Sequence, residues 1–339
     1  MAGLNEVATQ IDGAKLVGTK LNEKKEESNT RDSTDKDSSV KDYFTLTKPS
    51  VTLLVVISCI TGMVVASSND ASGNTFAQTH PLVIIATVVA TALGSASAAV
   101  FNMWYDRDID SVMKRTKHRP IVREVVHPDD AIVFSFLLGA FALMIMFLFV
   151  NVKASVLLLV SILFYVIIYT CILKRSTIQN IVIGGAAGSF PPVIGWTSVT
   201  NSIDAHSFIL FLLIFFWTPP HFWALALHRK DDYSSCNVPM MPCVKGDLYT
   251  KKQILIYTVI TFIVSLLPFV FKISGILYLC VALIAGFQFL KHSLRLLCLP
   301  QANLAIKLFG FSITYLFILL FGLILDHYTL HYYAYNYTT

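Results

Sequence analysis

Three oxygen-bearing side chains recur at every fourth residue where an apolar segment of the chain ends. The segment 82–101 carries no charge, and Asn102, Asp106 and Asp110 follow it directly. Residues four apart lie on one face of a helix, so these side chains form a polar stripe with two carboxylates. Such hard oxygen donors suit Mg²⁺, which completes its coordination with water and substrate phosphates. The position predicts a substrate with a phosphate head in water and an apolar tail in lipid.

A second acidic cluster lies in the loop 226–253, and a run of bases follows the first stripe. This cluster contains Asp231 and Asp232, and together with the stripe it predicts a catalytic site that binds diphosphate through two metal ions. The expected metal ligands are Asn102, Asp106, Asp110 and Asp232. The expected phosphate-binding bases are Lys114, Arg115, Lys117 and Arg119. Asp108 falls off the stripe and is expected to pair with a base. For either cluster alone, a solvated polar surface is the competing interpretation.

A histidine at membrane depth is the third candidate. His221 follows Pro219-Pro220 near the end of an apolar segment. It could ligate a heme iron, donate to a carboxylate or act as a general base, and a structural, hydrogen-bonded histidine is the alternative. Asn180 could contact diphosphate or a heme propionate, and Tyr165 and Tyr169 lie one turn apart.

The composition defines the elements that must position these groups. The chain has 339 residues, of which 55% are hydrophobic and 14% are charged, with mean hydropathy +0.64. These values indicate an all-α polytopic membrane protein, because backbone groups in lipid must be satisfied within helices. Nine segments are apolar enough to predict transmembrane helices: 51–67, 82–101, 131–150, 154–173, 178–199, 207–227, 254–271, 273–290 and 306–325.

Basic residues predict the orientation. If the N-terminus lies inside, the inner segments carry 24 of the 26 Lys and Arg residues, and the outer ones carry only Lys153 and Lys272. This positive-inside pattern places the C-terminus outside and both acidic loops inside. The net charge of +5 is thus explained by topology, without nucleic acid.

Residues 1–42 differ from the predicted nine-helix domain at 43–325. They are polar, with 9 acidic and 7 basic residues, which predicts a disordered inner tail. Acid-rich and Arg-poor, this tail is a poor mitochondrial presequence, so a bacterial inner membrane is the better prediction. Residues 326–339 are expected to form a short outer tail.

Glycines and prolines mark the fifth and sixth segments. Gly184-x-x-x-Gly188 predicts close helix packing. Pro219-Pro220 are expected to break the helical hydrogen-bond ladder, which membrane proteins tolerate where the backbone lines a cavity, and Pro191-Pro192 are expected to bend the fifth segment around a substrate cavity. His127-Pro-Asp-Asp predicts the start of the third helix.

Three stretches resemble the intramembrane aromatic prenyltransferases and, among them, the protoheme IX farnesyltransferase family. They are NMWYDRDIDSVMKRTKHRP from Asn102, LKRSTIQNIVIGGAAGSFPPVIGW from Leu173, and WTPPHFWALALHRKDDYSSCNVPMMP from Trp217. The resemblance covers about residues 43–325. Where that family usually has glycine after the Asp-Asp-Tyr, this chain has Asn237, which tolerates a left-handed backbone.

The resemblance implies nine helices around a central cavity, and Mg²⁺ as cofactor. It implies farnesyl diphosphate and heme b as substrates, heme O and diphosphate as products, and His221, Asn180 and Tyr169 as heme-binding residues. Heme A synthase or a terminal oxidase would be the partner that uses heme O.

Two other functions remain open. A prenyltransferase acting on an aromatic quinone precursor would share the first motif, but it would usually carry D-x-x-x-D in the second, where this chain has His228 four residues before Asp232. A heme or lipid carrier, or an oxidase assembly factor, would not need paired acidic sites on one side.

Overall fold

The computed structural model describes residues 38–66, 79–300 and 303–337, with side chains to 329. Within these residues every regular element is a helix, which confirms the all-α prediction. Of the predicted tail 1–42, residues 1–37 lie outside the described part of the chain. The first described helix, α2, is Val40–Leu46. Ser39 caps α2 through a reciprocal side-chain contact with Asp42.

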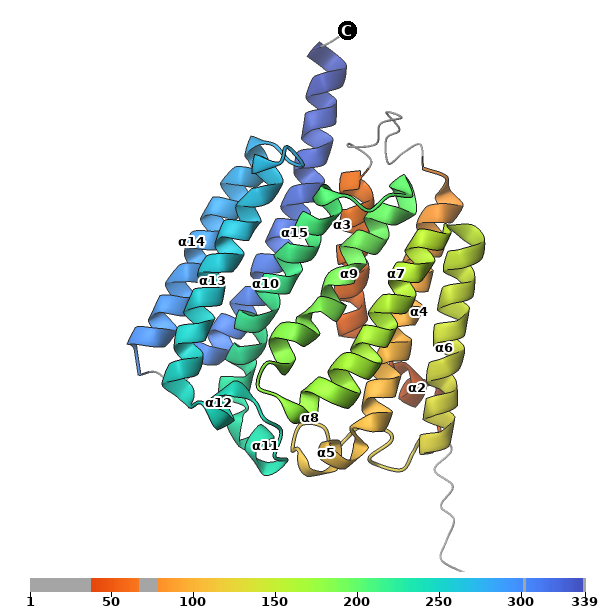
Figure 1. Cartoon of the computed structure of the whole chain (residues 1–339), viewed down its shortest axis with the longest axis vertical. Coiled ribbons are helices and arrows are strands. Elements are labelled where there is room, and N and C mark those ends of the chain that lie inside the picture. The colour runs from red at the N-terminus through yellow and green to blue at the C-terminus, as the bar shows by residue number, and fades with distance from the viewer. Residues whose placement is uncertain (1–37, 67–78, 301–302, 338–339) are drawn as a thin grey trace, which may run out of the picture. The chain divides into compact units, whose positions relative to one another are not determined.

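Each of the nine predicted apolar segments corresponds to a helical stretch of the structure. The long helices are α3 (Pro49–Ala66), α4 (Pro81–Tyr105), α6 (Pro128–Phe149), α7 (Val152–Leu163) with its π-helical continuation η2 (Phe164–Leu173), α9 (Asn180–Thr200), α10 (Ala205–His228), α13 (Asp247–Val270), α14 (Ile276–Cys298) and α15 (Leu304–Tyr337). They run roughly side by side in Figure 1. As predicted, α6 starts directly after His127, whose ring accepts from the backbone N–H of Asp129.

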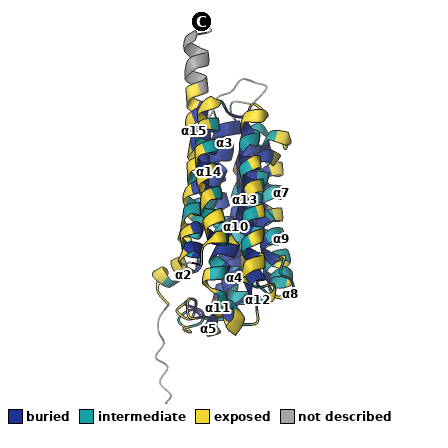
Figure 2. Cartoon of the chain, turned by 90° about the vertical axis from the view of Figure 1, so that its left-hand side faces the viewer, coloured by how far each residue is buried: buried dark blue, intermediate teal, exposed yellow. Residues whose placement is uncertain are grey.

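In the described part of the chain, eight helical stretches are long and apolar enough to cross a membrane. The helix α9 is not one of them, although it is 21 residues long, because it is rich in Gly, Ser, Thr and Pro. The count of nine spans therefore stays a prediction. The helices α6 and α7 bury little of their surface, and exposed apolar residues such as Phe136 and Val156 suit contact with lipid. Exposed residues also run along the outer side of α14 in Figure 2.

The proline pairs do not interrupt their helices. Both α9 and α10 continue through them, although each proline lacks the N–H that would bond to the carbonyl four residues back, which is the loss of ladder hydrogen bonds expected for Pro219-Pro220. Pro191 cannot bond the carbonyl of Ala187, which instead accepts from the Ser161 hydroxyl at 3.2 Å. Pro220 likewise frees the carbonyl of Phe216, and the Thr261 hydroxyl of α13 donates to it at 2.7 Å. Neighbouring helices thus replace the hydrogen bonds that proline removes.

The closest backbone contact between helices uses two glycines that the sequence motif did not indicate. A Cβ on Gly195 would lie 2.0 Å from the backbone oxygen of Cys59, and one on Gly62 would lie 2.0 Å from that of Pro192. These two glycines let the backbones of α3 and α9 touch. Of the two predicted glycines, Gly184 is closely packed, with its Cβ position 2.3 Å from the ring of Tyr169, whereas Gly188 has no atom within 4 Å of its Cβ position.

Five short helices gather at one end of the bundle, the lower end in Figure 1. They are α2, α5 (Arg107–Val112), α8 (Lys174–Ser176), α11 (Lys230–Ser235) and α12 (Met241–Val244). The two acidic loops therefore lie at the same end. At the opposite end α15 continues unbroken through the segment 326–337, where the sequence predicted a tail.

Candidate active site

The predicted polar stripe lies buried at the junction of α4 and α5. Asp106 ends α4 and precedes α5, and the backbone N–H of Asp110 still donates to the carbonyl of Asp106 at 2.8 Å. Asn102, Asp106 and Asp110 are 5%, 0% and 3% exposed. The amide of Asn102 donates to the Asp106 carboxylate at 2.6 Å. The stripe is thus a connected, enclosed set of oxygen donors.

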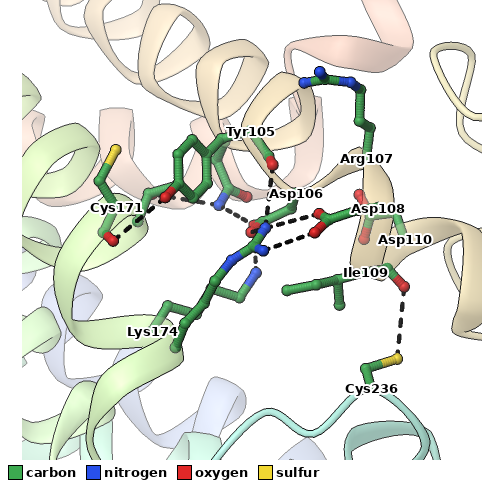
Figure 3. Close-up of polar contacts among 12 residues, drawn as sticks. Tyr105, Asp106, Arg107, Asp108, Ile109, Asp110, Cys171, Lys174 and Cys236 are labelled. Carbon is green, nitrogen blue, oxygen red and sulfur yellow. Dashed lines mark hydrogen bonds and ion pairs between the residues drawn. The ribbon is translucent and has the colours of Figure 1, made fainter.

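Cationic side chains from three other segments contact this stripe. Lys48, just before α3, donates to Oδ1 of Asn102 at 2.8 Å. Lys174 forms an ion pair with Asp106, and Arg175 lies 3.5 Å from the same carboxylate (Figure 3). Arg119 pairs with Asp110. Buried carboxylates are stable only when paired, so these bases balance the stripe.

The π-helix η2 places two of these bases. Its wider turns end at Lys174, whose backbone N–H bonds to the carbonyl of Tyr169 five residues back. Thr170, fully buried in η2, accepts from the Asn102 amide at 3.3 Å. One irregular segment therefore contacts the stripe through Thr170, Lys174 and Arg175, in agreement with the frequent occurrence of π-turns at functional sites.

Asp108 points away from the stripe and pairs with a base, as predicted. Its two carboxylate oxygens accept from Arg175, each at 2.7 Å. These hydrogen bonds lower the pKa of Asp108 below its usual value. Arg175 also lies over the ring of Tyr105, 4.9 Å from its centre. Arg175 therefore links the buried Asp106 to the exposed Asp108.

Only one of the four predicted phosphate-binding bases contacts the stripe. Arg119 does so, whereas Lys114, Arg115 and Lys117 are exposed in the turns after α5. Sequence reasoning missed Lys48, Lys174 and Arg175 as site residues. Their signal was position: each is a base at the inner end of a predicted span.

The second acidic loop approaches the first at α11. The thiol of Cys236 lies 3.6 Å from the carbonyl oxygen of Ile109 in α5. Burial raises the pKa of Tyr233, and the charges of Arg115, Asp232 and Arg119 also act on its hydroxyl. Asp232 is half-buried and Asp231 is exposed. Asn237 has φ +53°, a left-handed backbone conformation that asparagine tolerates.

The three residues predicted to bind heme lie in two different places. Tyr169 packs on α9, where a Cβ at Gly184 would be 2.3 Å from its ring, and its centroid is 5.3 Å from that of Tyr165. Asn180 is fully buried beside Lys174, whose carbonyl accepts from its amide at 3.4 Å, and its own side-chain oxygen has no described partner. His221 packs between α10 and α15.

The stripe fits a divalent cation. All three of its members present oxygen, and each already faces a positively charged side chain. Such a pocket favours positive charge, and its donors are those that Mg²⁺ prefers. Among the described side chains, no three His, Cys, Asp or Glu residues come together as a metal site, so Asp231 and Asp232 do not join Asp106 and Asp110 in one cluster.

An all-helical membrane protein with buried carboxylates and bases at one end has the features of an enzyme for amphiphilic phosphates. A model of the UbiA prenyltransferase family matches residues 55–331, and the chain belongs to this family. The resemblance drawn from the motifs is thereby confirmed.

The chain is similar to curated relatives in two Rickettsia species. It is 51% identical over 280 residues to the protoheme IX farnesyltransferase of Rickettsia felis, and this alignment covers 82% of this chain and 89% of the relative. To the enzyme of that name in Rickettsia bellii it is 50% identical, covering 82% and 90%.

Solved structures support the fold. A digeranylgeranylglyceryl phosphate synthase has TM-score 0.69 at 22% identity and covers 85% of this chain and 98% of its own. A UbiA homolog from Archaeoglobus fulgidus bound to GPP and Mg²⁺ has TM-score 0.58 at 15% identity, covering 84% and 99%.

Proposed function

We propose that this protein transfers the farnesyl group of farnesyl diphosphate to a vinyl group of protoheme IX (heme b), giving heme O and diphosphate. The observation that carries the proposal is the buried stripe of Asn102, Asp106 and Asp110 with its four basic partners. The names of the relatives, at about half identity over most of both chains, supply the acceptor.

The phosphate end of the substrate binds at the stripe. Asn102, Asp106 and Asp110 would hold one Mg²⁺, and Asp231 and Asp232 would help to hold a second. Bound Mg²⁺ neutralises diphosphate charge and eases its departure. Lys48, Lys174, Arg175 and Arg119, which now pair with the stripe, can donate to phosphate oxygens instead. Lys114, Arg115 and Lys117 are free of described ion pairs, and they attract the anion at the entrance.

The reaction breaks the allylic C–O bond and leaves an electron-poor farnesyl group. The heme vinyl group attacks it, and water then adds to the heme side and loses a proton, which leaves a hydroxyl group. Tyr165 and Tyr169 present aromatic faces, which stabilise cationic character. Asn180, with its unpartnered buried oxygen, contacts a polar group of a substrate, and His221 orients heme.

The distribution of basic residues indicates the orientation of the protein in its membrane. We infer a bacterial inner membrane, with the end that carries α5 and α11 inside and the C-terminus outside, because Lys and Arg concentrate at the predicted inner segments. Heme A synthase or a terminal oxidase would consume the product.

The test is a reaction of purified protein with heme b, farnesyl diphosphate and Mg²⁺, followed by mass analysis of the pigment and measurement of released diphosphate. Heme O formed in proportion to diphosphate supports the proposal. A product formed only with an aromatic quinone precursor would establish the other prenyltransferase function, and heme binding without diphosphate release would indicate a carrier.

A further inference from the structure

The imidazole of His221 is enclosed on three sides. Trp217 stacks on one side of the ring, with centroids 4.4 Å apart and planes 21° apart. Phe309 of α15 stacks as well, at 4.6 Å and 26°. Nδ1 lies 2.6 Å from the hydroxyl oxygen of Ser312. Nε2 makes no hydrogen bond with the described residues. It is also absent from the set of unpaired polar atoms that are completely buried, so it keeps some exposed surface. Phe222 packs edge-on as well, at 5.1 Å, so Nε2 is the one ring nitrogen left without a described partner.

The hydrogen bonds of Ser312 favour one tautomer of this ring. The Ser312 hydroxyl lies 2.6 Å from the carbonyl oxygen of Phe309, which can only accept. A hydroxyl has one proton, so the proton given to Phe309 leaves its oxygen to accept from His221. The Nδ1 atom then carries the proton, and Nε2 keeps its lone pair. Trp217 donates to the carbonyl of Ser312 at 2.8 Å and holds the same turn in place.

We propose that Ser312 is a positioning residue that fixes His221 as the Nδ1–H tautomer, so that Nε2 is presented to the iron of a metalloporphyrin. This inference rests on the proposed function, because it takes heme as the substrate. Metal-ligating histidines almost always donate their second ring N–H to a fixed acceptor, which sets the ring orientation and raises ligand basicity. The pair of Ser312 and the Phe309 carbonyl supplies that acceptor here.

The surroundings favour a neutral ligand over a general base. A histidine that takes up a proton is normally stabilised by a carboxylate at its second nitrogen. The described partners of His221 are a hydroxyl group and the aromatic rings of Trp217, Phe222 and Phe309. Aromatic walls on a rigid imidazole also offer an apolar surface on which a porphyrin can pack.

Binding of two porphyrins separates iron ligation from packing. Purified full-length protein is titrated with heme b, by absorbance and by electron paramagnetic resonance of the ferric form, and with metal-free protoporphyrin IX, by fluorescence. We expect His221→Ala to lose the imidazole-ligated heme spectrum and Ser312→Ala to weaken heme binding about 10–100-fold. Metal-free porphyrin should bind both variants within about twofold of the wild type, since only the iron bond is lost.

Two further variants complete the test. Ser312→Thr keeps the hydroxyl and should restore the wild-type heme spectrum. Thr314→Ala, an exposed position on α15 whose hydroxyl faces its own helix, should behave as wild type. The proposal is overturned if Ser312→Ala leaves heme binding unchanged, if both porphyrins weaken equally, or if His221→Ala keeps the ligated spectrum. If these spectra behave as expected but the wild type makes no heme O, the proposed function fails and the iron ligation stands.

Discussion

Lys48 and Asn102, 54 residues apart in the chain, are joined by a hydrogen bond of 2.8 Å near the C-terminal end of α4. Lys48 has φ +47°, a backbone conformation that is costly for a residue with a Cβ. Burial, together with the charges of Arg119 and Lys174, lowers the pKa of Lys48 to about 7, against the opposing effect of Asp110 and Asp106. Lys48 therefore lies next to the stripe as a base whose charged and neutral forms are both populated near pH 7.

The first prediction concerns pH. Because the folded pKa is depressed from 10.5 to about 7, Lys48 is charged below pH 7 and loses its charge above it. Affinity for farnesyl diphosphate should therefore fall as pH rises from 6 to 8.5, by at most roughly tenfold per pH unit. Lys48→Arg keeps its charge and controls for the ionisation of diphosphate itself. Equal pH profiles for wild type and Lys48→Arg, measured by calorimetry, would contradict the assignment.

The second prediction contrasts two neighbouring carboxylates. Asp106→Asn leaves Lys174 with no described ion-pair partner, and breaking a buried pair costs about 3–5 kcal/mol of unfolding free energy. We expect farnesyl transfer to fall by at least about 100-fold, since direct ligands matter more than their supporting residues. The matched variant Asp108→Asn alters a pair that is exposed on the Asp108 side.

Exposed pairs contribute about 0–1 kcal/mol, so Asp108→Asn should retain most activity. Heme O formation by mass analysis and thermal unfolding in detergent check both variants. Wild-type turnover in a correctly inserted Asp106→Asn protein would exclude the stripe as the metal site.

The sequence predicted the acidic half of the site better than the basic half. Asn102, Asp106 and Asp110 follow one helical period, so local spacing was enough to place them on one face. Their partners Lys48 and Lys174 come from segments that meet α4 only in the folded bundle. The π-turns that aim Lys174 and Arg175 have no composition that distinguishes them from an apolar α-helix.

The helices were predictable from hydropathy, but their contacts were not. Gly184 and Gly188 match a packing motif, yet the close approach of α3 and α9 uses Gly62 and Gly195. These two glycines lie in different helices, so no motif within one segment indicates that they pack together. The same limit applies to proline: which hydroxyl replaces a missing hydrogen bond depends on the neighbouring helix. The Ser161 contact to Ala187 is an example.

The third prediction tests this helix contact. Gly195→Ala would bring a Cβ to within 2.0 Å of the Cys59 backbone oxygen, which cannot move aside as a flexible side chain could. We expect α3 and α9 to separate, with a loss of about 1–3 kcal/mol as in other overpacked sites. Gly188→Ala, on the same helix with open space around it, should unfold like the wild type. Equal melting temperatures for the two variants would show that the helices adjust freely.

The fourth prediction concerns the second acidic loop. The contact of Cys236 with Ile109 holds α11 against α5, and Asp232 acts on the same Tyr233 hydroxyl as Arg119, the ion-pair partner of Asp110. If Asp232 helps to bind a second Mg²⁺, Asp232→Asn should raise the Mg²⁺ concentration for half-maximal rate by about 10-fold or more, because a charged ligand is lost. Asp247→Asn removes a carboxylate from the same loop that pairs with Lys230 and is not itself a proposed ligand, and it should leave that concentration unchanged. The rates are compared over a Mg²⁺ titration at saturating farnesyl diphosphate. An unchanged curve for Asp232→Asn would restrict metal binding to the stripe and leave α11 a purely structural role.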